Sequence, residues 1–154
     1  MWRVIEIRGN QSLHQLHTTI FKAFDRWDDH LYSFFMSKDR HDATQEYASP
    51  YFFEEDEFPT EALPRDAAQA RTDTLNLRRG LKFWYMFDYG DDWEHAVEVM
   101  SIAQDEPRRR YPRIVERQGE SPDQYHDYEE EPEFLEDDLT EPGRVIRMFP
   151  KSET

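Results

Sequence analysis

The stretch from Phe87 to His95 constrains the fold of this chain more than any other segment. It reads F-D-Y-G-D-D-W-E-H, so five ionisable and three aromatic side chains surround a single glycine. Apolar runs flank it on both sides. Strand-forming runs separated by a short polar segment with glycine are typical of a β-hairpin. We therefore predict antiparallel strands over 81–88 and 93–102, the first of them central in its sheet because it is apolar on both faces.

The length of the hairpin loop decides which side chains share a face of the sheet. A loop of two or four residues gives one register, in which Asp88 faces Trp93 and Trp84 faces Val97. Asp88 then lies diagonally opposite His95, about 7–8 Å away between backbones. The same register predicts a largely buried Trp93, whereas a loop of three residues would break the pairing.

The N-terminal part of the chain predicts a strand, a helix and a second strand. Residues 2–8 are rich in β-branched side chains and end at a Gly-Asn pair, as strands often do. Ser12 stands three residues before Gln15 and forms a capping box, after which apolar residues recur at helical spacing. This pattern predicts a helix over 13–27, and the apolar run over 31–36 predicts the next strand.

Residues 38–80 carry weaker patterns. Several prolines and an acidic cluster predict a loop, within which the aromatic run 51–53 is a candidate strand. One helical turn is expected near Ala67, and a short helix that begins near Asp73 would end at Gly80.

Composition limits the class of protein. A chain of 154 residues favours one compact domain, and the strand and helix patterns make it an α+β domain with helices on a mixed or antiparallel sheet. The absence of cysteine excludes disulfides, thiolate catalysis and cysteine-ligated metals. No apolar run is long enough to cross a bilayer and no signal-peptide pattern is visible at the N-terminus. We therefore expect a soluble, cytoplasmic protein that makes no membrane contact.

Charge is spread unevenly along the chain. The net charge is −15, and eleven of the 34 acidic residues fall between Glu120 and Glu141, where there is no lysine or arginine. This asymmetry predicts a folded domain over 1–118 and an acidic, partly irregular C-terminal extension over 119–154. Negative charge repels phosphate, which argues against direct contact with nucleic acid, whereas a basic protein partner could dock on the extension.

Residues 82–95 resemble the signature of the plasmid pRiA4b ORF-3-like family, which reads F-x-Y-x-[YF]-D-[FY]-G-D-x-W-x-H. Three further segments resemble family elements in the same order: 27–34, 73–75 and 110–113. The resemblance covers roughly 2–113 and implies an α+β fold in a functionally uncharacterised family. Many members carry cysteines after the Tyr-Pro element, and this chain has none, so any thiol-based site of the relatives is missing.

Two motifs, one ending in His30 and the other in His95, supply the candidate catalytic residues. These residues are His95, Asp88 and His30. A His–Asp pair suits general-base chemistry, and imidazole with carboxylate ligands suits Zn, Mn or Fe. If both motifs serve one site, Asp88 would orient His95 through one ring nitrogen, and His30 would lie close enough to share a ligand. The candidates for ligand binding are four hairpin residues: Asp91, Asp92, Trp93 and Tyr89.

A purely structural role is the alternative, and the one that we favour. Asp88 and Asp92 would then cap the turn through bonds from side chain to backbone. Trp93 would fill the core, and His95 would be a buried, hydrogen-bonded histidine.

Three functions remain open. We favour a non-catalytic binding or interaction module with a protein partner, linked to mobile genetic elements as the family name suggests. The alternatives are a metal-dependent or acid–base enzyme that uses His30, His95 and Asp88, and an accessory protein that docks a basic partner through its acidic tail. No cofactor is predicted, although the enzyme alternative allows a divalent metal. His14 and His17 are three residues apart and could bind one metal ion together, but we favour a solvated helix face.

Overall fold

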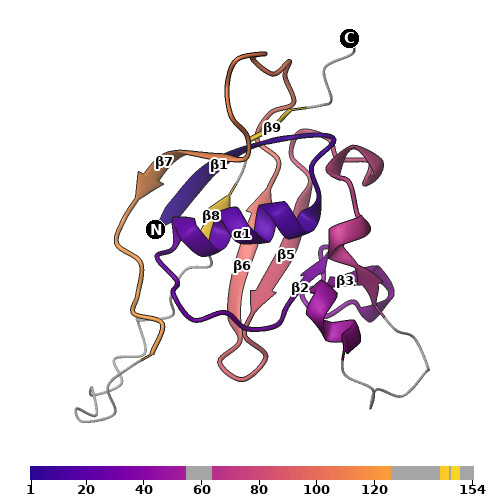
Figure 1. Ribbon diagram of the computed structural model, residues 1–154, viewed down its shortest axis with the longest axis vertical. Helices are drawn as coiled ribbons and strands as arrows, with labels where there is room; N and C mark the ends of the chain where they lie inside the picture. Colours follow the sequence, from indigo (N-terminus) through magenta and orange to yellow (C-terminus); the bar gives the residue numbers. More distant parts are fainter. Residues whose placement is uncertain (55–63, 126–142, 146, 150–154) are drawn as a thin grey trace.

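A computed structural model describes residues 1–54, 64–125, 143–145 and 147–149 of the chain. Within these parts, one α-helix packs with two β-sheets, so the predicted α+β class is confirmed (Figure 1). The smaller sheet has the order β7-β1-β9, and the larger sheet has the order β4-β3-β2-β5-β6-β8. The strands are β1 (Trp2–Arg8), β2 (Tyr32–Phe35), β3 (Glu46–Ala48), β4 (Arg65–Asp66), β5 (Lys82–Phe87), β6 (Trp93–Glu98), β7 (Arg113–Gln118), β8 (Gly143–Val145) and β9 (Arg147–Phe149).

The helix α1 (Leu13–Ala23) begins where the capping box predicts. The side chain of Ser12 accepts the N–H of Gln15, and the side chain of Gln15 accepts the N–H of Ser12. The helix ends earlier than the predicted residue 27, because Asp25 adopts a left-handed φ of 55°. The N–H groups of Asp25 and Arg26 bond back to carbonyls of the last helical turn at 3.1 and 3.0 Å, which closes a Schellman motif.

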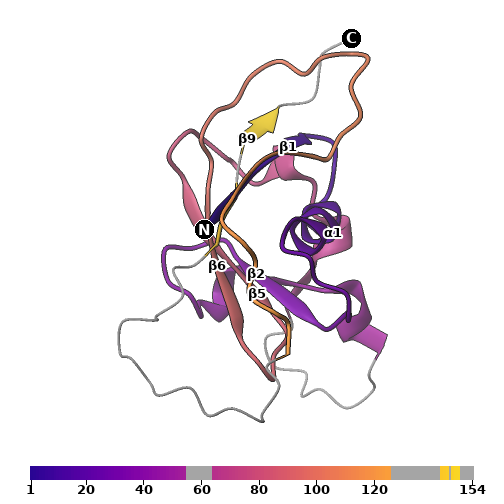
Figure 2. The same cartoon turned by 90° about the vertical axis from the view of Figure 1, so that its left-hand side faces the viewer.

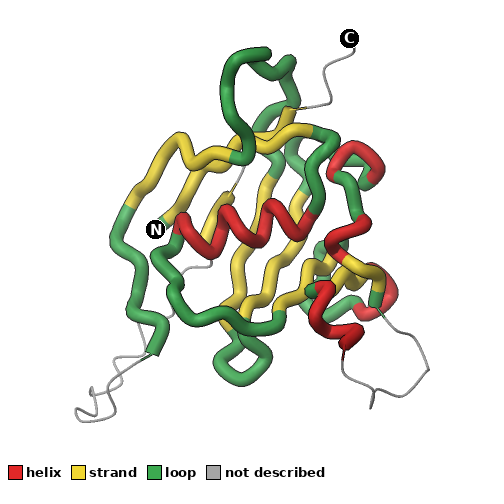
Figure 3. The backbone as a smooth tube through the Cα atoms, viewed as in Figure 1, coloured by secondary structure: helices red, strands yellow, loops and turns green. Residues whose placement is uncertain are grey.

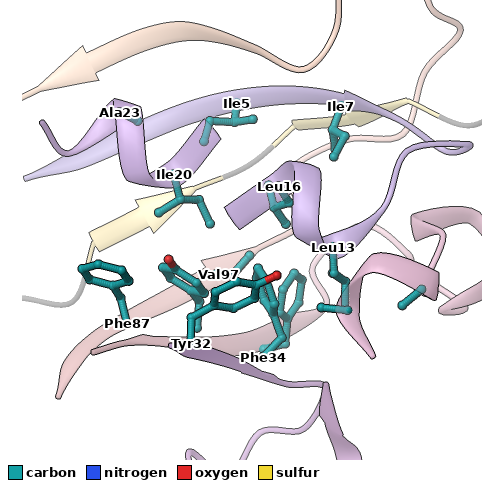
Figure 4. Close-up of a cluster of buried hydrophobic side chains, with 14 of the residues drawn as sticks. Ile5, Ile7, Leu13, Leu16, Ile20, Ala23, Tyr32, Phe34, Phe87 and Val97 are labelled. Carbon is teal, nitrogen blue, oxygen red and sulfur yellow. The ribbon is translucent and has the colours of Figure 1, made fainter. Parts of the chain in front are cut away.

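The core lies between α1 with β1 on one side and the larger sheet on the other (Figure 2, Figure 4). Aliphatic side chains of β1 and α1 meet aromatic side chains of β2 and β5. Burying one such side chain is worth about 1.5–3 kcal/mol, so the aromatic content compensates for a low average hydropathy. The buried set includes Ile5, Ile7, Leu13, Leu16, Ile20, Tyr32, Phe34, Phe83, Tyr85 and Phe87.

The predicted order of strand, helix and strand is confirmed, but its two strands belong to different sheets. β1 pairs with β7 and β9, whereas β2 pairs with β3 and β5. β5 lies between β2 and β6, which confirms its central position. The single sheet of the sequence prediction is therefore divided into two.

The segment from 36 to 80 differs from its prediction in several places. The aromatic run 51–53 lies in the 3-10 helix η2 (Pro50–Glu54) and is not a strand, whereas the strands β3 and β4 were not predicted. The helical turn near Ala67 is confirmed as η3 (Ala67–Gln69). The short helix predicted to begin near Asp73 is the single turn η4 (Thr72–Thr74). A further 3-10 turn, η1 (Ala43–Gln45), lies between β2 and β3.

The C-terminal extension contributes backbone to both sheets. β8 pairs in parallel with β6, and β9 pairs in parallel with β1. β7, just before the extension, was not predicted either. The boundary at 118/119 stays a prediction, and the acidic stretch 126–142 lies outside the described residues. In the described part of the chain, no helix has the length and apolar character needed to cross a membrane.

Candidate functional site

The hairpin loop holds five residues, Asp88 to Asp92, so the predicted register is wrong by one residue. Phe87 faces Trp93, and Tyr85 faces His95. The loop closes because Asp88 and Asp92 both adopt left-handed φ angles of 64° and 50°, and the Asp92 N–H donates to the Asp88 carbonyl at 2.7 Å. An odd number of loop residues moves every partner to the other face of the sheet.

Asp88 is buried at the start of this loop and caps it. Its Oδ1 accepts the N–H groups of Gly90 and Asp91 at 3.0 and 3.4 Å. Its own N–H donates to the Leu31 carbonyl at 2.9 Å, which ties the loop to the connection between α1 and β2. Both segments lie at the same end of the larger sheet (Figure 3). The capping role is the one that the structural interpretation gave to Asp88.

His95 lies inside the core, on the inner face of β6. Its Nδ1 is 3.0 Å from the Trp93 carbonyl and 3.3 Å from the Tyr85 carbonyl, so Nδ1 carries the hydrogen and donates it to the backbone. Its ring packs edge-on against Phe24. Burial and then the charge of Arg26 lower the pKa of His95 to about 4, so the ring is neutral at pH 7. Backbone carbonyls, and not Asp88, therefore orient this ring through Nδ1.

His30 is the histidine that meets Asp88. Its Nε2 lies 3.6 Å from Asp88 Oδ2, 3.5 Å from Asp28 Oδ2 and 2.6 Å from the Tyr125 hydroxyl. The Tyr125 hydroxyl also lies 2.6 Å from Asp28 Oδ2. The hydrogen bond to Asp28 raises the pKa of Tyr125 to about 12, so the phenol stays protonated and donates to that carboxylate. The single hydroxyl proton is then used, and His30 Nε2–H becomes the donor to the phenol oxygen.

The first residues of the C-terminal extension contact the same segment, 27–30. Gln124 is buried, and its Oε1 accepts the N–H groups of Trp27 and Asp28 at 3.0 and 3.2 Å. Its Nε2 donates to the Asp28 carbonyl at 2.7 Å. Tyr125 then packs edge-on against Trp27, with ring centroids 5.5 Å apart. We call Trp27, Asp28, His30 and Tyr125 the Trp27–Tyr125 surface.

Tyr125 is the member of this surface that the sequence does not single out. It falls inside an acidic stretch without apolar periodicity, so no pattern distinguishes it from the tyrosine at 128. The helix predicted over 13–27 includes Trp27 on its apolar face. Because the helix ends before it, the Trp27 side chain is 71% exposed.

The other hairpin candidates have separate positions. The Tyr89 hydroxyl bonds to Ser33 Oγ at 2.7 Å and to the Tyr32 carbonyl at 3.1 Å. Asp91 and Asp92 are exposed at the loop. Trp93 is half-buried against the core rather than largely buried, and its ring is covered by the Arg26 guanidinium at 4.1 Å. Trp84 faces Ala96 and so lies on the opposite face of the sheet from Trp93.

The histidine pair on α1 faces the sheet and not the solvent. His14 Nδ1 lies 2.7 Å from the Tyr32 hydroxyl, and His17 Nδ1 lies 2.6 Å from the Tyr85 hydroxyl. Burial lowers the pKa of His17, although a hydrogen bond to Asp29 acts in the opposite direction. The predicted solvated face is therefore wrong for His17. Among the residues described, no three or more His, Asp or Glu side chains are arranged to hold a metal ion.

The fold and these contacts define an α+β protein with an aromatic hairpin. Gln124 and Tyr125 complete the polar cluster around His30 at the end of this hairpin. The family model of the plasmid pRiA4b ORF-3-like protein matches residues 1–143. The chain belongs to this family, so the resemblance is confirmed and extends beyond residue 113. No match is found among curated proteins or among solved structures.

Proposed function

We propose that the protein is a non-catalytic interaction module that binds a protein partner through the Trp27–Tyr125 surface. One observation carries the proposal: Trp27 is the most exposed large apolar side chain among the described residues, yet its backbone is fixed by Gln124. Exposed aromatics on a fixed backbone bind with little loss of conformational entropy and are enriched in binding hot spots. Because the family name refers to a plasmid, we include in this proposal a role associated with mobile genetic elements.

The state of the candidate catalytic residues supports the same proposal. His95 is buried with Nδ1 on backbone carbonyls, and Asp88 uses Oδ1 to hold the loop. A general base must reach a substrate proton within hydrogen-bond distance, which a histidine sealed in the core does not offer. Two hollows of the described surface lie away from these residues. One is lined by 38–43 with Trp84, and the other by residues of α1 with Pro112 and Ile114.

A comparison of two exposed aromatics tests the proposal. Trp27→Ala and Tyr51→Ala both remove an exposed ring, and Tyr51 lies in η2, outside the Trp27–Tyr125 surface. Wild type, Trp27→Ala and Tyr51→Ala are used to capture partners from native cells, and the captured complex is then rebuilt from purified components. We expect a defined complex with wild type and Tyr51→Ala that is lost with Trp27→Ala. Equal complex formation by all three proteins would overturn the proposal.

Acid–base chemistry is a second candidate, because His30 Nε2 lies 3.6 Å from Asp88 Oδ2 and His30 is only partly buried. A carboxylate beside an imidazole is the usual arrangement of a general base. Elemental analysis of the purified protein tests the metal-dependent form of this candidate, in which one equivalent of bound Zn or Mn is expected and lost in His30→Ala. The proposed interaction module requires neither a bound metal ion nor its loss in His30→Ala.

A further inference from the structure

We infer that the partner is a basic polypeptide segment, and that one of its arginine side chains stacks on the indole of Trp27 while neighbouring carboxylates bind its charge. This inference rests on the proposed function and names the chemistry of the partner. It follows from the cations, carboxylates and rings around Trp27.

Exposed charge around Trp27 is negative. Asp28 and Asp29 each leave a large part of their side chain exposed, whereas the exposed Asp25 pairs with Arg117 at 3.3 Å. The one cation among residues 25–29, Arg26, is buried and lies over the Trp93 ring instead. A cationic side chain that approaches Trp27 therefore meets carboxylates, and an anionic one is repelled.

Other parts of the structure add to this charge. The neutral partner of Asp29, His17, cannot cancel its charge, because burial lowers the pKa of that histidine. Asp91 of the hairpin loop lies near enough to act on the Tyr125 hydroxyl electrostatically. Asp123 is exposed two residues before Tyr125.

In the described part of the chain, Trp27 lacks the arginine that two other tryptophans of this protein have. The guanidinium of Arg40 lies 4.4 Å from the Trp84 ring, and that of Arg26 lies 4.1 Å from the Trp93 ring. Among the described residues, no arginine or lysine lies over the ring of Trp27. Tryptophan is the ring that binds cations best, so an indole with carboxylates beside it and no cation from the described residues is open to a cation–π contact.

Arginine fits this surface better than lysine. Its planar guanidinium stacks on an indole and donates to carboxylates at the same time, whereas lysine presents a compact ammonium group. The ion pairs alone are exposed and contribute little affinity, so the ring provides the selectivity and the carboxylates increase the association rate. Nucleic acid is disfavoured as the occupant, because its phosphates would face this negative surface.

Fluorescence anisotropy tests the inference with a short labelled peptide of alternating arginine and glycine. Trp27→Ala leaves the net charge unchanged, so any loss of affinity measures the ring and not the electrostatic attraction. We expect Trp27→Ala to weaken binding about 3- to 30-fold, the range of a cation–π contact, and Tyr51→Ala to have no effect. The matching lysine peptide should bind more weakly than the arginine peptide and lose less on removal of Trp27.

Each other outcome contradicts the inference. Equal affinity of wild type and Trp27→Ala for the arginine peptide would show that net charge alone attracts the peptide. Tighter binding of a glutamate–glycine peptide or of single-stranded DNA would reverse the assigned chemistry. If the captured partner still depends on Trp27 while the arginine peptide does not, this inference fails and the interaction module stands. If only the peptide depends on Trp27, the interaction module fails.

Discussion

His17 of α1 lies flat against Tyr32 of β2, with ring centroids 3.7 Å apart and planes 11° from parallel. Burial raises the pKa of Tyr85, so its hydroxyl keeps its proton and donates to His17 Nδ1 at 2.6 Å. The hydrogen of His17 is then on Nε2, which faces Asp29 at 3.7 Å. The helix is therefore joined to the sheet by a buried chain of polar groups in addition to apolar contacts.

Mild acid should weaken the fold through its buried histidines. Burial lowers the pKa of His95 to about 4 from an ordinary value of 6.5. A histidine whose folded pKa is lowered stabilises the protein above the unfolded pKa, and this contribution is lost as pH falls from 6.5 towards 4. At pH 5 the loss through His95 is about 2 kcal/mol. Carboxylates are still largely ionised there, so the histidines dominate the change.

Urea unfolding at pH 7 and at pH 5 checks this prediction. Wild type should lose stability between the two conditions, and His95→Gln should lose about 2 kcal/mol less than wild type. His41→Gln, at an exposed position, is the control and should follow wild type. The same pH dependence in wild type and His95→Gln would contradict the burial of His95.

Two tryptophans should respond differently to truncation. Trp93 packs against the core under Arg26, so Trp93→Ala should cost about 2–4 kcal/mol, below the full range for a buried aromatic. Trp27 is exposed, and Trp27→Ala should change stability by less than about 0.5 kcal/mol. Urea unfolding measures both. A large cost for Trp27→Ala would move that residue from a binding surface to the fold.

Asp88 should be replaceable by asparagine and not by alanine. Its φ of 64° favours aspartate, asparagine or glycine, and its Oδ1 accepts two loop N–H groups. Asp88→Ala should cost about 1–3 kcal/mol, because the left-handed angle is strained and the loop donors lose their acceptor. Asp88→Asn keeps the angle and the acceptor and should stay near wild type in thermal unfolding. Equal losses in both variants would point to the charge facing His30 instead.

The start of the C-terminal extension should stabilise the domain. A chain that ends at Gln118 loses the three bonds of Gln124, whereas a chain that ends at Tyr125 keeps them. The shorter chain should be less stable by about 1–3 kcal/mol in urea, because the N–H groups of Trp27 and Asp28 lose their acceptor. Equal stability would instead support the sequence prediction that everything after residue 118 is separate from the folded domain.

Local patterns predicted the starts of elements better than their ends. The capping box at Ser12 fixed the first turn of α1, because both of its bonds lie within four residues. The end of α1 was missed because Asp25 occupies the left-handed position where glycine is the usual signal. The hairpin register was missed for a similar reason. Two aspartates take left-handed angles, and the loop then has an odd number of residues.

The candidate site was predicted in part. The two histidine motifs do meet, and they meet through His30 and Asp88 rather than through His95. Once the register shifts, His95 turns into the core, which no pattern within the hairpin could decide. Tyr125 and Gln124 come from a distant segment, and their positions depend on tertiary contacts that sequence periodicity does not encode.

The two partners of β1 have a consequence for biosynthesis. β1 pairs with β7 and with β9, and both strands are translated more than one hundred residues after it, as the pairing of Arg8 with Phe149 illustrates. Ribosomes add roughly 5–20 residues per second, so both edges of an apolar strand stay open for several seconds in the nascent chain. Unpaired apolar edges template aggregation, and contacts of such long sequence separation form slowly. Yield in cells should therefore depend on chaperones that cover the nascent N-terminal strand until its partners emerge.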